Sequence, residues 1–196
     1  MASVYYLEKN VLSREECDAA AKYIEDNSED DYRDHYKHSG MLLYDVLAGE
    51  LPKELVPVRK AVKLAGQTFL ENYEFTYNRF ELKRLFGNIM YKGAINEPHD
   101  DDGDVYPGKN DIEEHYSCIL MLNSEYEGGE LYFEHHGIEV RLEAGDLIMF
   151  RGNAANLHGV REVLSGKRVN VIIFFRNFEL DRDYDEDIWK DFMGQD

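Results

Sequence analysis

The chain has 196 residues, of which 43% are hydrophobic and 13% aromatic, and its formal net charge is -18 at pH 7. This composition excludes a disordered chain, because disordered chains have too few apolar and aromatic residues to form a core. The acidic excess would repel a phosphate backbone, so we expect no nucleic-acid partner. The length predicts a single domain that folds without disulfides.

The two cysteines, Cys17 and Cys118, lie far apart in apolar stretches and suggest no disulfide framework. The N-terminal sequence MASVYYLEKN has neither the basic nor the apolar part of a signal peptide. No apolar run reaches the roughly 18 residues that a membrane span needs. We therefore expect a soluble, intracellular, cytoplasmic protein that has no membrane partner.

The first part of the chain is predicted to be helical. Residues 13–16 (SREE) have the pattern of a capping box, and an amphipathic segment follows at 17–24. Residues 29–40 are polar and predict an exposed loop with a short ribbon. A second helix is expected from Pro52, as its first residue, to about Tyr73. Its apolar positions recur at spacings of three and four: Leu55, Val58, Val62, Ala65 and Phe69.

After Phe75 the pattern changes to short extended segments, interrupted by an acidic, turn-rich loop at 100–114. Strands are predicted at 116–122, 129–133, 138–142, 146–150, 157–163 and 168–175, with glycine or asparagine turns between them. Short strands of this kind predict an antiparallel sandwich or barrel. Helices before strands predict an α+β chain with the helices on one outer face. The acidic segment 181–196 is expected to form a short helix or a tail.

A histidine and an aspartate suggest a metal site around position 100. On an extended segment, His99 and Asp101 point to the same face, whereas Asp100 and Asp102 point away from it. His158 lies in a later predicted strand. Two histidines and one carboxylate on one face leave three octahedral positions open, as in the facial triad of iron(II) oxygenases. The residues alone also allow a chance His-Asp pair and a core histidine at 158.

The other histidines have no such partners and are expected in loops or on the surface: His35, His38, His115, His135 and His136.

Arg168 stands ten residues after His158, at the start of the most apolar predicted strand, 169–175. A cation facing the interior there is costly unless an anion pairs with it. The guanidinium fork suits a carboxylate. The alternative is that Arg168 precedes the strand and lies in solvent beside Lys167.

Together these features resemble the prolyl 4-hydroxylase-like branch of the 2-oxoglutarate/iron(II) dioxygenases. The resemblance covers about Tyr91 to Phe175. Its pieces are His99-Asp-Asp101, SCILMLN (117–123), GGELYF (128–133), EAGDLIMF (143–150), His158 with VREV (160–163), and Gly166-Lys167-Arg168. The N-terminal phrase VLSREECDAAAKYI is similar to the helix that opens such domains.

The resemblance implies a double-stranded β-helix, or jelly roll, with N-terminal helices packed on one face. It implies one dioxygenase domain over 1–196. Helical support would cover about 1–75, the jelly-roll core about 76–178, and an acidic C-terminal extension 179–196.

The resemblance also assigns the cofactors. His99, Asp101 and His158 would hold Fe(2+), and 2-oxoglutarate would be the co-substrate, with ascorbate as a reductant. No catalytic residue beyond the metal ligands is expected.

Arg168 takes the position that pairs with the distal carboxylate of 2-oxoglutarate in the family. Tyr91 and Ser117 are further expected contacts of the co-substrate. Tyrosines of relatives are replaced at two positions, Asn96 and Met121. Ser117 or Asn88 is therefore expected to complete the hydrogen bonds.

The function implied is Fe(II)- and 2-oxoglutarate-dependent hydroxylation of prolyl residues in a peptide or protein. The acidic loops at 29–47 and 100–114 would receive a basic or proline-containing peptide. One alternative is the same chemistry on a small molecule or free amino acid. Another is a non-catalytic jelly-roll module that binds a metal.

Overall fold

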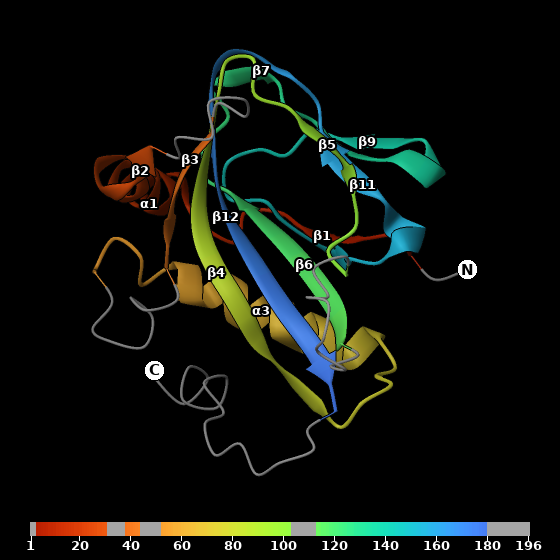
Figure 1. Cartoon of the computed structure of the whole chain (residues 1–196). Coiled ribbons are helices and arrows are strands. Elements are labelled where there is room, and N and C mark those ends of the chain that lie inside the picture. The colour runs from red at the N-terminus through yellow and green to blue at the C-terminus, as the bar shows by residue number, and fades with distance from the viewer. Residues whose placement is uncertain (1–2, 31–37, 44–51, 103–112, 180–196) are drawn as a thin grey trace.

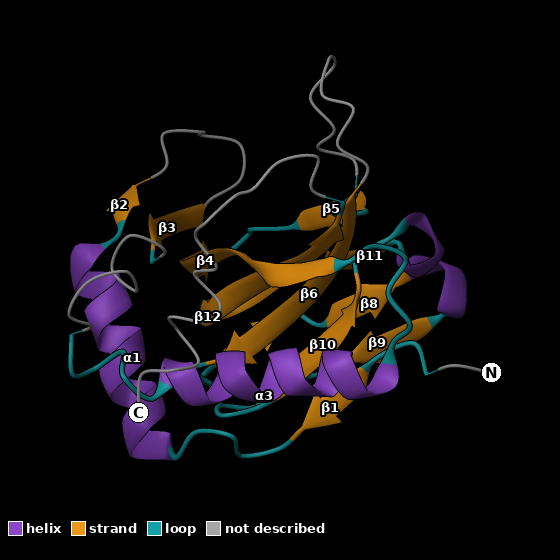
Figure 2. Cartoon of the chain, turned by 90° about the horizontal axis from the view of Figure 1, so that it is seen from below, coloured by secondary structure: helices purple, strands orange, loops and turns teal. Residues whose placement is uncertain are grey.

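The computed structural model describes residues 3–30, 38–43, 52–102 and 113–179. In these ranges, two antiparallel sheets pack face to face, and two helices cover the outer face of the larger sheet (Figures 1 and 2). Helices on one face of packed sheets confirm the predicted α+β arrangement. None of the described helices is long and apolar enough to cross a membrane.

Within the described ranges, the larger sheet has eight strands in the order β1-β10-β6-β12-β4-β3-β2, with β7 paired to β12. They are β1 (Tyr6–Glu8), β10 (Leu147–Arg151), β6 (Glu113–Met121), β12 (Val163–Phe178), β4 (Arg79–Tyr91), β3 (His38–Leu42), β2 (Glu29–Asp30) and β7 (Tyr126–Gly128). The smaller sheet has the order β5-β11-β8-β9: β5 (Asn96–His99), β11 (His158–Val160), β8 (Leu131–Phe133) and β9 (Ile138–Val140). The 3-10 helices are η1 (Glu134–His136) and η2 (Ala154–Asn156).

Helix α1 (Arg14–Asn27) begins with the predicted capping box. The Glu16 amide donates to Ser13 Oγ at 3.2 Å, and the Ser13 amide donates to Glu16 Oε2 at 2.8 Å. A Cβ on Gly87 of β4 would lie 2.7 Å from Ile24 Cγ2, so only glycine lets α1 pack this closely on the sheet.

Helix α3 (Val58–Asn72) starts later than predicted. The expected start at Pro52 is wrong: the segment from Pro52 forms turns, and Pro57 is the N-cap. A helix from Pro52 would place Pro57 inside it, where proline lacks an amide donor and its ring clashes with the preceding turn. All five predicted apolar positions are nevertheless buried.

The larger sheet separates two hydrophobic clusters. One lies between this sheet and the helices, and the other lies between the two sheets. Strand β12 has both faces covered, and alternation decides which cluster each side chain enters. The helix side receives Val169, Val171, Ile173 and Phe175. The opposite side lines a cavity between the sheets with Arg168, Asn170, Ile172 and Phe174.

The predicted strands are present with adjusted ends. The segment 157–163 contains β11 and only the first residue of β12. The short ribbon expected in 29–40 exists as the pairing of β2 with β3. Residues 31–37 and 103–112, within the two acidic loops, lie outside the described residues, as does the acidic segment 181–196.

Candidate metal and co-substrate site

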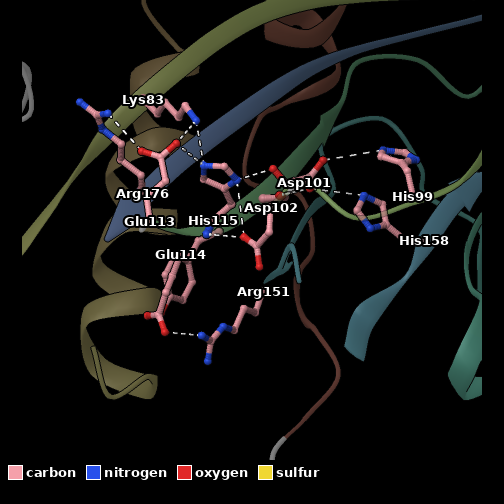
Figure 3. A network of polar contacts seen from close by, with 12 residues as sticks. Lys83, His99, Asp101, Asp102, Glu113, Glu114, His115, Arg151, His158 and Arg176 are labelled. Carbon is pink, nitrogen blue, oxygen red and sulfur yellow. Dashed lines mark hydrogen bonds and ion pairs between the residues drawn. The ribbon is translucent and has the colours of Figure 1, made fainter. Parts of the chain in front are cut away.

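The structure brings His99, Asp101 and His158 together. His99 ends β5 and His158 begins β11, and the two residues are paired across these strands. Asp101 Oδ1 lies 3.7 Å from His99 Nε2, and Asp101 Oδ2 lies 3.5 Å from His158 Nε2. The three candidate ligand atoms lie within 4.8 Å of one another. Figure 3 shows both imidazoles directed toward the Asp101 carboxylate.

Both imidazoles are oriented by backbone carbonyls. His99 Nδ1 donates to Glu97 O at 2.8 Å, and His158 Nδ1 donates to Asn156 O at 3.1 Å. Because a carbonyl only accepts, each Nδ1 carries a proton, and the neutral form of each ring then has a free lone pair on Nε2. Burial lowers the pKa of His158, although Asp101 opposes this effect. Imidazoles that a backbone carbonyl fixes through Nδ1 are typical metal ligands.

Asp101 is held from two sides. Ser117 Oγ donates a hydrogen bond to Asp101 Oδ2, and the Asp101 amide donates to Gly152 O at 2.8 Å. A Cβ on Gly152 would lie 2.6 Å from both Asp101 Oδ2 and Ser117 Oγ, so the carboxylate occupies space that only glycine leaves. Asp102 instead accepts from the His115 amide at 3.0 Å. Ser117, predicted to contact the co-substrate, contacts the metal-cluster carboxylate and also lines the cavity.

His115 contacts Asp101 from the side away from the two imidazoles, and its predicted position was wrong. It is only 4% exposed, whereas a loop or surface position was expected. Its Nδ1 donates to the Asp101 carbonyl, and its Nε2 lies 2.8 Å from both Lys83 Nζ and Glu113 Oε1. Figure 3 shows this chain of contacts leading from Asp101 to Lys83 and Glu113. The burial of His115 could have been predicted, because His115 and Ser117 are two residues apart on β6 and therefore face the same side of the strand.

This network strongly favours the ionised form of Glu113. Burial alone would raise its pKa, but hydrogen bonds from His115 and Lys83 outweigh burial and hold the pKa well below its usual range. Arg176 adds a further ion pair, with Nη1 at 3.2 Å from Glu113 Oε2. The network therefore supports the backbone of the Asp101 segment with fixed charges.

The remaining histidines lie outside the metal cluster or outside the described residues. His135 and His136 are exposed in η1, as expected. His38 was expected in a loop but lies on β3 and lines the cavity. His35 lies outside the described residues.

A cavity of about 260 Å³ joins the cluster to the interior face of β12. Arg168 forms its deep end and is 1% exposed, so the predicted inward orientation is observed and the solvent alternative is wrong. Its Nη1 donates to Asn170 Oδ1 at 2.6 Å, but its Nε and Nη2 have no hydrogen-bond partner. Within the described ranges, no acidic residue forms an ion pair with Arg168. Burial lowers the pKa of this guanidinium, which stays charged because arginine titrates so high.

Tyr91 is not brought to this cavity. Arg168 is opposite Met90 in the β4–β12 register, and Met90 therefore faces the interior while Tyr91 faces away. The Tyr91 side chain is 40% exposed, and its hydroxyl lies 3.1 Å from Ser39 Oγ. The expected contact between Tyr91 and 2-oxoglutarate has no support in this position.

The shallow end of the cavity is apolar and aromatic. Ile172, Phe174 and Phe86 line it and are only partly buried. The Phe86 and Phe174 rings lie 6.1 Å apart, and the Arg84 guanidinium lies 5.1 Å from the Phe86 ring centre. The cavity thus runs from a buried cation to an open apolar mouth.

Residues 86–176 match the family model of the 2OG-Fe(II) oxygenase superfamily, and this range contains the cluster and Arg168. This segment is similar to the superfamily, and the similarities of the chain are to its prolyl hydroxylase-like branch. The family to which this segment is similar uses Fe(2+) and 2-oxoglutarate.

Two curated relatives illustrate the similarity. Prolyl 3-hydroxylase 1 of Gallus gallus is 33% identical over 84 residues, which cover 38% of this chain and 12% of the relative. The PKHD-type hydroxylase Smlt1146 of Stenotrophomonas maltophilia is 50% identical over 60 residues, which cover 27% of this chain and 24% of the relative. The matches therefore span less than a quarter of these relatives.

Solved structures resemble a larger part of the chain. A viral collagen prolyl hydroxylase from Paramecium Bursaria Chlorella virus-1, in a complex with 2OG, has a TM-score of 0.70 at 17% identity. The similarity covers 89% of this chain and 96% of that structure. HygX from Streptomyces hygroscopicus, with nickel and 2-oxoglutarate bound, has a TM-score of 0.62 at 12% identity, covering 89% of this chain and 83% of that structure. These neighbours confirm the predicted jelly-roll fold.

Proposed function

We propose that this protein hydroxylates prolyl residues of a peptide or protein, using Fe(2+) held by His99, Asp101 and His158. Arg168 binds the distal carboxylate of 2-oxoglutarate. The observation that carries the proposal is a single cavity that joins a three-donor cluster to a buried, incompletely paired guanidinium.

The donor set fits iron. Two imidazole Nε2 atoms and one carboxylate converge, and within the described ranges no fourth protein ligand joins them. A structural zinc site usually has four protein ligands, whereas an oxygenase needs open positions for its co-substrate and dioxygen. When bound, iron would activate dioxygen, which oxidises both reactants: one oxygen atom enters succinate as 2-oxoglutarate loses carbon dioxide, and the other hydroxylates the substrate.

The deep end of the cavity fits the co-substrate. Arg168 has two nitrogens without a hydrogen-bond partner, Nε and Nη2, and a carboxylate can accept from both at once. A charge buried without a counterion is costly, and a dicarboxylate ligand would relieve that cost. The role of Arg168 in this chain is thus to orient the co-substrate along the cavity.

The shallow end supports a prolyl substrate. A pyrrolidine ring is compact and apolar, and it can pack against the partly exposed Phe86 and Phe174 rings. Prolyl hydroxylases occur both among the curated relatives and among the structural neighbours. The acidic net charge of -18 favours a peptide with basic residues beside the proline.

A small-molecule substrate is a second candidate. The HygX neighbour has also been solved with nickel, 2-oxoglutarate and hygromycin B bound, at a TM-score of 0.60. A comparable use of the cavity here would place a small molecule, rather than a peptide, at the apolar mouth.

The test measures turnover in air by purified protein that has first been loaded with Fe(II) under nitrogen. Succinate and oxygen uptake are measured with a library of proline-containing peptides, their Pro→Ala counterparts and small molecules. We expect one peptide class to gain one oxygen atom on proline, detected by mass spectrometry. His99→Ala and Arg168→Met should abolish this turnover. Arg161→Met is the matched control, because Arg161 is exposed and pairs with Glu139 outside the cavity.

Stimulation by small molecules alone would contradict the prolyl assignment. A wild-type protein that neither binds nor consumes 2-oxoglutarate would contradict the whole proposal.

A further inference from the structure

His115 contacts the Asp101 segment with both its backbone and its side chain. Its amide donates to Asp102 Oδ1 at 3.0 Å, and its carbonyl accepts from the Gly152 amide at 2.9 Å. Its Nδ1 donates to the Asp101 carbonyl, while the Asp101 amide donates to the Gly152 carbonyl at 2.8 Å. Both backbone groups of Asp101 are therefore held, one by Gly152 and the other by the His115 side chain.

The opposite edge of the His115 ring is held by an ion pair. Lys83 Nζ and Glu113 Oε1 contact each other, and each lies 2.8 Å from His115 Nε2. The lysine can donate to a lone pair on Nε2 and the glutamate can accept from a proton there, so Nε2 has a partner whether or not it carries a proton. Burial and these two contacts fix the ring with Nδ1 toward Asp101 (Figure 3).

The contact with the Asp101 carbonyl acts on a candidate metal ligand through its backbone. Ser117 Oγ donates to Asp101 Oδ2 and so orients the side chain, whereas His115 holds the peptide unit to which that side chain is attached. Metal sites tolerate deviations of only about 0.2 Å in ligand distances. Groups that orient a ligand without touching the metal commonly change metal affinity by about 10- to 100-fold.

We propose that His115 is a positioning residue of the metal site, whose Nδ1–H fixes the Asp101 backbone and thereby the place of the Asp101 carboxylate. The Lys83–Glu113 pair sets the ring for this contact. This inference rests on the proposed function, because it takes Asp101 as a metal ligand.

Two substitutions separate this role from a purely structural one. The side-chain nitrogen of asparagine is as many bonds from Cα as Nδ1 of histidine, and that of glutamine as many as Nε2. His115→Asn therefore keeps a donor for the Asp101 carbonyl and loses the contacts with Lys83 and Glu113. His115→Gln does the reverse.

The test measures the Kd of Co(II) alone by calorimetry, together with the visible spectrum of the bound ion. His115→Gln should raise the Kd by roughly 10- to 100-fold and change the spectrum, because the carboxylate is no longer held in place. His115→Asn should stay close to wild type in both. His135→Asn is the matched control, because His135 is exposed in η1, and it should leave the Kd unchanged.

The melting temperature of the metal-free variants reports the structural role separately. A histidine that only supported the fold would lose Co(II) affinity in parallel with stability, whichever edge of the ring is lost. Equal losses of Co(II) affinity in the two variants, or a larger loss in His115→Asn, would refute the positioning role.

A direct readout uses wild-type protein and so avoids any folding defect. The side-chain 15N–1H spectrum of the Zn(II)-loaded protein, with His115 assigned through its nuclear Overhauser contacts, should show a proton on Nδ1. If Nδ1 carries no proton, the Asp101 carbonyl cannot accept from it and the role of His115 is refuted while the metal site remains. If wild type binds Co(II) no more tightly than His99→Ala, the metal site of the proposed function fails and the role of His115 fails with it.

Discussion

Gly152→Ala should weaken metal binding without unfolding the protein. The new Cβ would lie 2.6 Å from Asp101 Oδ2, whereas ordinary contacts begin at 3.4 Å. The carboxylate would have to withdraw by about 0.8 Å (3.4 − 2.6) along that contact. Metal sites tolerate deviations of only about 0.2 Å in ligand distances. Because the displaced atom belongs to a metal ligand, affinity should fall by about 10- to 100-fold, as for changes that disturb ligand orientation.

Stability should respond differently. Gly152 is not among the described glycines with positive φ, so alanine is compatible with its backbone. The clashing oxygens are side-chain ends that can rotate, but the new Cβ would also lie 2.9 Å from Asp101 Cβ, which must shift with its backbone. This shift offsets the about 0.4–1 kcal/mol that Gly→Ala gains at a compatible position through the unfolded state. The melting temperature of the metal-free protein should therefore change by only a few degrees, since about 1 kcal/mol corresponds to 2–4 °C at this size.

The assay is a Mn(II) titration by calorimetry in the presence of 2-oxoglutarate, with the melting temperature measured on metal-free protein. Gly137→Ala provides the opposite control. Gly137 has φ 61° and nothing within 4 Å of an added Cβ, so alanine should cost about 1 kcal/mol of stability and leave metal affinity unchanged. If Gly152→Ala and the wild type bind Mn(II) with equal affinity, the Asp101 carboxylate does not bind the metal from the space beside Gly152.

Three further predictions concern the cavity and its supporting network. Glu113→Gln should lower the free energy of unfolding at neutral pH. Because the folded pKa of Glu113 is held below its ordinary 4.5, its contribution is present above that pH and is lost as pH falls further. Urea unfolding should therefore show the two proteins converging toward pH 3, and a constant difference would contradict this. Phe174→Ala should raise the KM of an active peptide about tenfold while the Kd of 2-oxoglutarate stays constant, and an unchanged KM would place the substrate elsewhere. Arg168→Met should raise the melting temperature of the ligand-free protein, because it removes a buried cation without a counterion, and should abolish stabilisation by 2-oxoglutarate. A lower melting temperature would show that Arg168 supports the fold.

Local rules predicted parts of the candidate metal site, whereas the resemblance implied that His158 joins His99 and Asp101. The spacing of His99 and Asp101 places both on one side of the chain, and the turn signals around 158 predicted a strand there. Side-chain parity along β12 likewise places Arg168 and Asn170 on one face. These features depend on one strand at a time, so they can be predicted without knowledge of strand pairing.

Features that depend on pairing between distant strands were missed. Parity shows that Met90 and Tyr91 face opposite ways, but only the register of β4 against β12 decides which of them meets Arg168. The contact of His115 with Asp101 crosses from β6 to the segment after β5. The space above Gly152 exists because β10 ends beside Asp101, which no local pattern encodes.

The residues that line the deep cavity are poor choices for stability alone. A buried guanidinium with two unpartnered nitrogens and a buried amide without an acceptor each cost about 1–3 kcal/mol or more, because they lose water and gain nothing in return. Apolar side chains of similar volume would pack there at no such cost. A module that only held a metal would need the cluster of His99, Asp101 and His158, but neither Arg168 nor Asn170. Their joint presence at the end of the same cavity is therefore explained best by an anionic co-substrate, and it argues against the non-catalytic alternative.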